Sequence, residues 1–126
     1  MAKFIRYCKT QEQHYGDNVF DVSRPNVLGN PYTHIKDRET KALVKVKNRD
    51  EAIDLYGPYF DKMYETDSVF QKEVDRLYDA IKNFDTIYIG CYCKLEERCH
   101  SDIIIQKMTQ RMMKEILDNI RKNRNE

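Results

Sequence analysis

The sequence lacks the features that mark membrane proteins, strongly charged proteins and secreted proteins. Its longest uninterrupted apolar run is the three residues Ile103 to Ile105, which excludes a membrane-spanning helix of about 20 apolar residues. The 22 Lys and Arg residues nearly balance the 21 Asp and Glu residues, so no excess charge indicates nucleic acid or a membrane as a partner. Residues 1–6 contain no apolar segment of a signal peptide, and we therefore expect a cytoplasmic protein with reduced thiols.

The length and the aromatic content indicate one folded domain. A chain of 126 residues can close one hydrophobic core and is too short for two independent cores. Nine Tyr and five Phe residues argue against disorder. We expect a single domain over residues 1–120, followed by a polar tail at residues 121–126.

Alternation of strand and helix patterns predicts a small α/β fold. We expect strands at residues 4–8, 19–23 and 86–93, a weaker strand at 43–46, and helices beginning near residues 48, 67 and 100. The order is strand, strand, possible strand, helix, helix, strand, helix, which is typical of a Rossmann-like layered sheet with flanking helices.

The helix signals carry three further expectations. Asn48 can cap the first helix, because Glu51 follows three residues later in a capping-box arrangement. Pro58 should kink or break that helix, since proline has no N–H to donate to Asp54. The last helix carries an apolar stripe from Ile104 to Ile120, which we expect to be buried.

Three of the four cysteines are crowded into a short segment. Cys8 stands alone, whereas Cys91, Cys93 and Cys99 lie within nine positions and His100 follows directly. A secreted disulfide framework would spread its cysteines through the sequence. The cluster therefore indicates a functional segment.

Two segments of the sequence resemble a known family. They are SRPNVLGNPY at residues 23–32 and IGCYCKLEERCHSDI at residues 89–103, with RDEAIDLY at residues 49–56 between them. In this order they resemble the domain-of-unknown-function family 4326, which is common in bacteriophages and bacteria. The resemblance extends over about residues 5 to 105. It implies a site formed by these segments, and the host cytoplasm as the location if the protein is phage-encoded, but no reaction.

The second segment joins the end of a predicted strand to the start of the last helix. Cys91 and Cys93 are two positions apart on that strand, so we expect their side chains on one face, either facing a ligand or, for Cys91, filling the core. Cys99 and His100 begin the helix, where free backbone N–H groups favour an anion, commonly phosphate. We expect His100 to act as an acid or base and Cys99 as a nucleophile.

Neighbouring polar residues complete the predicted pocket. Ser101 stands where the family usually has glycine, and its hydroxyl can contact a ligand. Asp102 suits the helix dipole but would repel an anion that it faced. Lys94 and Arg98, in the preceding loop, can add positive charge.

The first segment is a loop stiffened by two prolines, which we expect to fold beside the same helix start. Arg24 offers a planar fork for phosphate or carboxylate, and Gly29 allows a close backbone approach. Asn30 can read the edge of a base. The alternative is that Arg24 and Asn30 tie the loop to the core through buried polar contacts.

These residues predict a domain that binds or processes a nucleotide-like phosphorylated small molecule. The chemistry, if there is any, would be hydrolysis or transfer at a glycosidic or phosphoryl bond. Sequestration of a host signalling nucleotide without chemistry is equally open, so the sequence leaves open whether the protein is an enzyme.

Two other functions remain as alternatives. Zinc can bind three thiols and an imidazole, but the spacing of Cys91, Cys93, Cys99 and His100 does not reproduce the usual zinc knuckles. We therefore expect no cofactor, and a zinc-stabilised structural domain is the less favoured interpretation. The other alternative is a non-enzymatic phage protein that inhibits a host protein through an apolar patch in the region 108–113.

Overall fold

The computed structural model describes residues 2–24, 26–33 and 44–124, with side chains omitted at 33, 44 and 45. Residue 43 of the predicted weak strand lies outside the described residues. None of the described helices combines the length and the apolarity needed to cross a bilayer.

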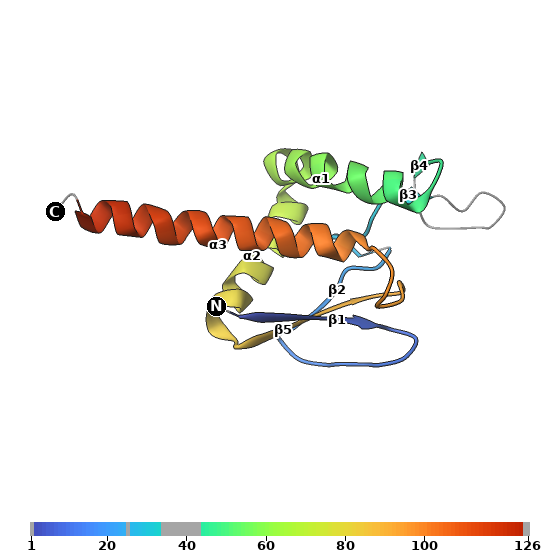
Figure 1. Cartoon of the computed structure of the whole chain (residues 1–126), viewed down its shortest axis with the longest axis horizontal. Coiled ribbons are helices and arrows are strands. Elements are labelled where there is room, and N and C mark those ends of the chain that lie inside the picture. Colours follow the sequence, from blue (N-terminus) through green and yellow to red (C-terminus); the bar gives the residue numbers. More distant parts are fainter. Residues whose placement is uncertain (1, 25, 34–43, 125–126) are drawn as a thin grey trace.

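A parallel sheet of three strands forms the base of the fold (Figure 1). Strand β5 (Thr86–Cys91) lies between β1 (Lys3–Cys8) and β2 (Val19–Asp21), and both pairings are parallel. A second, two-stranded parallel sheet pairs β3 (Tyr32–Thr33) with β4 (Val44–Lys45). Parallel strands place their carboxyl ends at one edge of a sheet, so the chain leaves β1, β2 and β5 on the same side.

Three helices complete the mixed α/β architecture that the sequence predicts. They are α1 (Arg49–Thr66), α2 (Ser68–Asn83) and α3 (His100–Arg124). The predicted cap is confirmed, because the Asn48 side chain accepts the N–H of Glu51 at 2.8 Å. Asp67 caps α2 in the same way by accepting the N–H of Phe70. Each such cap contributes about 1 kcal/mol of stability.

The predicted break at Pro58 is wrong, because α1 continues through this proline to Thr66. Two buried aromatic side chains, Tyr56 and Phe60, lie on either side of it and pack into the core. Burial of side chains of this size contributes about 1.5–3 kcal/mol each, which offsets the roughly 3 kcal/mol cost of an interior proline.

One hydrophobic core joins the helices to the sheet. Helices α2 and α3 contact β5, and α1 contacts both of these helices. Ile87 and Ile89 of β5 are fully buried against Leu77 of α2 and Ile104 of α3. Strand β5 is therefore the centre of the fold, and the packing of this strand fixes the position at which the following loop begins.

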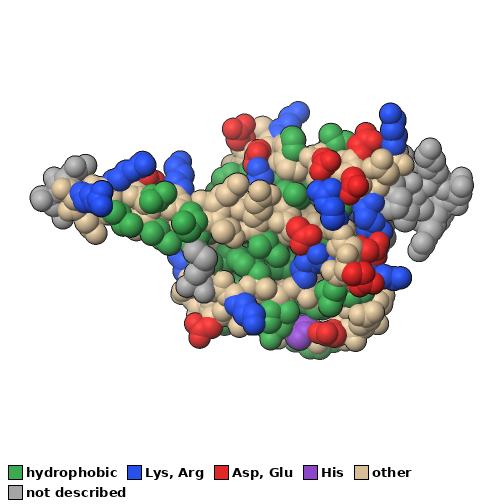
Figure 2. All heavy atoms as spheres, viewed as in Figure 1, with side chains coloured by type: hydrophobic (Ala, Val, Ile, Leu, Met, Phe, Trp, Pro, Cys, Tyr) green, Lys and Arg blue, Asp and Glu red, His purple; other side chains and the backbone are tan. Residues whose placement is uncertain are grey.

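Helix α3 extends well beyond this core (Figure 1). A helix of 25 residues is about 37 Å long, whereas six-residue strands span only about 20 Å. The prediction that its apolar stripe is buried throughout is thus wrong, since Ile116, Leu117 and Ile120 are 42–48% exposed. Figure 2 shows these hydrophobic side chains along the projecting end.

The region 108–113, which the sequence suggested as a contact for a host protein, is only partly exposed. Met108 is buried and Met112 is half-buried, whereas Met113 is exposed. Inhibition of a host protein stays a prediction.

Candidate functional site

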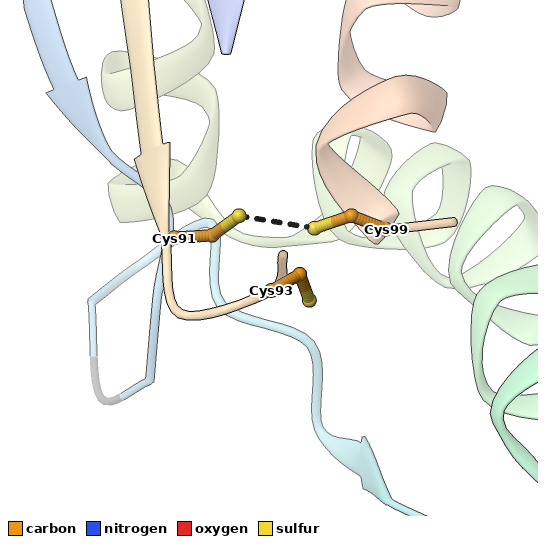
Figure 3. Close-up of side chains that lie close together, drawn as sticks. All are labelled: Cys91, Cys93 and Cys99. Atoms are coloured by element: carbon orange, nitrogen blue, oxygen red, sulfur yellow. Dashed lines mark hydrogen bonds between the residues drawn. The ribbon is translucent and has the colours of Figure 1, made fainter. Parts of the chain in front are cut away.

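The three clustered cysteines converge at the carboxyl end of β5 (Figure 3). The strand ends at Cys91 rather than at the predicted Cys93, and the chain bends before returning to Cys99 at the start of α3. The three Sγ atoms all lie within 4.8 Å of one another. Those of Cys91 and Cys99 are 3.3 Å apart, which is too long for a disulfide and close enough for a hydrogen bond between thiols.

An arginine of the first strand holds the loop that carries these thiols. Arg6 donates to both carboxylate oxygens of Asp102 at 3.0 Å and to the backbone carbonyls of Lys94 and Glu97 at 3.1 Å. Asp102 also accepts the N–H of Cys99 at 3.2 Å. The loop and the first turn of α3 are therefore fixed to β1 by charge-assisted hydrogen bonds.

Within the cluster, negative charge is favoured at Cys99. The pKa of Cys99 is lowered by hydrogen bonds from the Cys91 and Cys93 thiols and by the neighbouring His100. The backbone N–H of Ser101 also points to its sulfur, at 3.5 Å. The pKa of Cys91 is raised, because hydrogen bonds with Cys93 and Cys99 and burial favour its protonated form.

His100 is buried, and both of its nitrogens contact other protein groups. Its Nε2 lies 2.7 Å from the carbonyl oxygen of Val22 and its Nδ1 lies 3.6 Å from the sulfur of Cys99. A carbonyl only accepts, so Nε2 carries a proton, and Nδ1 faces the Cys99 sulfur. The contact with Val22 places the residue directly before the first motif segment against the start of α3, and it makes His100 a structural link between the two. The proposed acid or base role of His100 stays a prediction.

Asn30 and Gly29 shape the first segment itself. The Asn30 amide donates to the carbonyl of Ala52 at 3.0 Å and accepts the N–H of Tyr32 at 3.0 Å. A Cβ on Gly29 would lie 3.1 Å from the backbone of Arg24, which is tighter than most contacts allow. Asn30 thus ties the loop to α1, and Gly29 allows the close approach of the backbone within the loop.

The guanidinium of Arg49 contacts Cys93, and that of Arg24 interacts with Cys93 electrostatically. Arg24 is half-buried and donates to the carbonyls of Asn30 and Tyr32 at 2.9 and 3.2 Å. Burial lowers the pKa of Arg24, and Cys93 nearby opposes that change. Arg49, from α1, points one nitrogen at the Cys93 sulfur, at 3.6 Å, and pairs through another with Glu97 at 2.9 Å.

Residues expected to add charge or a hydroxyl are placed differently. Arg98 pairs with Asp50 and Asp54 on the exposed surface of α1, and Lys94 contributes its backbone to the loop. The Ser101 side chain is fully buried, and its hydroxyl has no hydrogen-bond partner among residues 2–24, 26–33 and 44–124.

Comparison with known proteins identifies the family. A family model described as Domain of unknown function (DUF4326) matches residues 5–110. The chain belongs to this family. No curated protein and no solved structure matches the sequence. The match includes Arg6, both motif segments and all three clustered thiols, and it confirms the resemblance that the sequence indicated.

Sequence reasoning missed Arg6 and Arg49. Arg6 lies between Ile5 and Tyr7 in a predicted strand, and an arginine among apolar strand residues is a signal of a buried ionic partner. Arg49 lies in the middle segment of the family resemblance, directly after the predicted Asn48 cap. No local pattern links it to Cys93, which is 44 positions away.

Proposed function

We propose that the protein binds a small phosphate-bearing, nucleotide-like ligand at a surface formed by Arg24, Arg49 and Cys93. This surface is called the arginine–thiol face below. The proposal is for binding and assigns no reaction, because His100, the histidine that the described residues place near the thiols, is buried with both nitrogens engaged.

The observation that carries the proposal is the environment of Arg24. Its guanidinium is half-buried, yet its hydrogen bonds in the described part of the chain go only to neutral carbonyl oxygens. Desolvation of a cation is costly unless an anion or a hydrogen-bonding network compensates for it. A second guanidinium, that of Arg49, contacts Cys93, which also acts electrostatically on Arg24. Two planar forks at one place suit a phosphate group.

This proposed phosphate site lies at a different place from the one that the sequence predicted, which was the start of α3. The first N–H groups of α3 are used by the chain itself, since Ser101 donates to the Cys99 sulfur and Asp102 donates to the Cys99 carbonyl. These contacts favour the arginine–thiol face over the helix start for a phosphate group.

Thermal unfolding in the presence of ligands tests the proposal. Inorganic pyrophosphate and nucleoside mono-, di- and triphosphates would be screened by differential scanning fluorimetry. A ligand present at 100 times its Kd stabilises the folded state by about 2.7 kcal/mol. For a chain of this size that corresponds to a rise in Tm on the order of 10 °C.

Matched arginine variants locate the binding. Arg49→Ala and Arg24→Lys should lose most of the ligand-induced rise in Tm, while Arg98→Ala, an exposed arginine paired with α1, should keep it. Arg24→Lys retains the charge but not the fork, so it separates planar recognition from simple charge. The proposal is overturned if no phosphate compound raises Tm, or if Arg98→Ala loses the response as Arg49→Ala does.

A further inference from the structure

We propose that Cys91, Cys93 and Cys99 bind one zinc ion through their three sulfurs, with the fourth coordination position open. The inference rests on the sulfur geometry and goes beyond the proposed phosphate binding, which does not require it. It also revises the sequence-based expectation, in which the spacing of the cysteines counted against a metal.

The distances between the sulfurs suit a single ion. Zinc–sulfur bonds are about 2.3 Å long, so sulfurs at the corners of a tetrahedron around zinc lie roughly 3.8 Å apart. The three Sγ atoms here lie within 4.8 Å of one another, and those of Cys91 and Cys99 are 3.3 Å apart. Small side-chain rotations would bring all three to the spacing that one ion requires.

The bend after β5 explains why the sequence pattern was misleading. Two cysteines of a C-x-C pair on a straight strand are too widely spaced to act as a compact knuckle. The strand ends at Cys91, and the chain then turns, which brings the sulfurs of Cys93 and Cys99 within 4.8 Å of that of Cys91. Figure 3 shows the Cys99 sulfur directed at the Cys91 sulfur, with Cys93 beside them on the turn. The Arg6 contacts to the carbonyls of Lys94 and Glu97 fix the connecting loop.

The surroundings match the charge of a zinc–thiolate centre. Each bound thiol loses its proton to solvent as its sulfur–metal bond forms, and no electron is transferred. A zinc ion with three thiolates carries one net negative charge. The guanidinium of Arg49 donates to the Cys93 sulfur at 3.6 Å, and the N–H of Ser101 donates to the Cys99 sulfur at 3.5 Å. Such hydrogen bonds orient metal ligands and stabilise their charge.

His100 is a positioning residue in this arrangement. Its Nδ1 contacts the Cys99 sulfur, but the ring does not lie within 4.8 Å of all three sulfurs. Its Nε2 is bound to the Val22 carbonyl, which holds the ring in place. Three protein ligands and an open position are typical of zinc sites that accept water or a small ligand. Cys93, the half-buried cysteine, is the one of the three that Arg49 contacts.

Metal analysis tests the inference directly. Protein expressed in zinc-supplemented medium would be dialysed and its zinc content measured by mass spectrometry, with one ion per chain expected. Metal-free protein would then be titrated with Co²⁺, whose tetrahedral thiolate complexes absorb visible light, and with Zn²⁺ to displace it.

The fourth cysteine supplies the control. Cys8 is buried but lies outside the cluster, so Cys8→Ser should bind metal as the unmodified protein does. Cys93→Ser should weaken zinc binding by more than about 100-fold, because loss of a group that only supports a ligand already costs about 10- to 100-fold. Cys93 is the least buried of the three, so this variant should fold even if Cys91→Ser does not.

Two results would overturn the zinc site. One is a zinc content near zero together with no visible absorption on cobalt addition. The other is an equal loss of metal in Cys8→Ser and Cys93→Ser. Neither result bears on phosphate binding, because the fluorimetric screen with Arg49→Ala and Arg98→Ala requires no metal and gives its own answer.

Discussion

Arg6→Met should destabilise the protein and loosen the thiol cluster. The substitution retains an apolar stem but removes both hydrogen bonds to the Asp102 carboxylate and the bonds to the carbonyls of Lys94 and Glu97. The Arg6 side chain is only 14% exposed, whereas that of Asp102 is 48% exposed. In the variant, water can therefore replace part of the hydrogen bonding that the Asp102 carboxylate loses, but it has little access to the position of the Arg6 side chain.

The size of the effect follows from these contacts. A hydrogen bond to a charged group contributes about 1.5–3 kcal/mol, and the contributions of neighbouring bonds do not add fully. After allowance for the exposure of Asp102, we expect a loss of roughly 2–3 kcal/mol in the free energy of unfolding. That loss lowers Tm by on the order of 10 °C in a chain of this size.

Thermal unfolding and thiol labelling would measure the two consequences. Arg98→Ala is the control, because this arginine also pairs with two carboxylates but lies on the surface. Arg98→Ala should leave Tm nearly unchanged, while Arg6→Met should lower Tm and also increase the rate at which Cys93 reacts with iodoacetamide. If the two variants lower Tm equally, the loop is not held by Arg6 and the reasoning fails.

Two further predictions concern the core and the response to pH. Ile104→Ala should lower the free energy of unfolding, measured by chemical denaturation, by about 2–5 kcal/mol, because the side chain is fully buried. Ile116→Ala, on the projecting part of α3, should change it little. Similar losses in the two variants would mean that the end of α3 is covered in solution. Burial and a hydrogen bond to the Glu115 carboxylate raise the pKa of Tyr78 to about 12, above that of the unfolded chain near 10. The resulting stability is present below about pH 10 and is lost as the pH rises towards 12, so Tyr78→Phe should show a smaller fall in Tm over this range, and an unchanged fall would contradict the assignment.

The sequence predicts most of the fold because its local signals agree with one another. The Asn48 cap, the run of strand-forming residues from Thr86, and the start of the last helix at His100 all rest on patterns within a few residues. Pro58 is the exception, since a local rule for proline was outweighed by the burial of its aromatic neighbours. The apolar stripe on α3 is present, but its periodicity does not show at which residue the helix extends beyond the rest of the domain.

The site was only partly predictable, for a different reason. Both motif segments and the cysteine cluster were found from the sequence, and the contact of His100 with the Val22 carbonyl brings the residue directly before the first segment against the second. The roles within the site depend on long-range contacts. Arg6 meets Asp102 across 96 positions, and Arg49 meets Cys93 across 44. No pattern of spacing within a segment contains these pairs.

Protection of Cys93 by a phosphate compound would test most directly whether the arginines and the thiols form one binding site. Metal-free protein would be alkylated with iodoacetamide with and without pyrophosphate or a nucleoside diphosphate, and the labelled cysteines identified by mass spectrometry. We predict that the anion slows labelling of Cys93 in the unmodified protein and in Arg98→Ala, but not in Arg49→Ala. Labelling of Cys93 at the same rate with and without the anion would contradict the proposal that a ligand occupies this face.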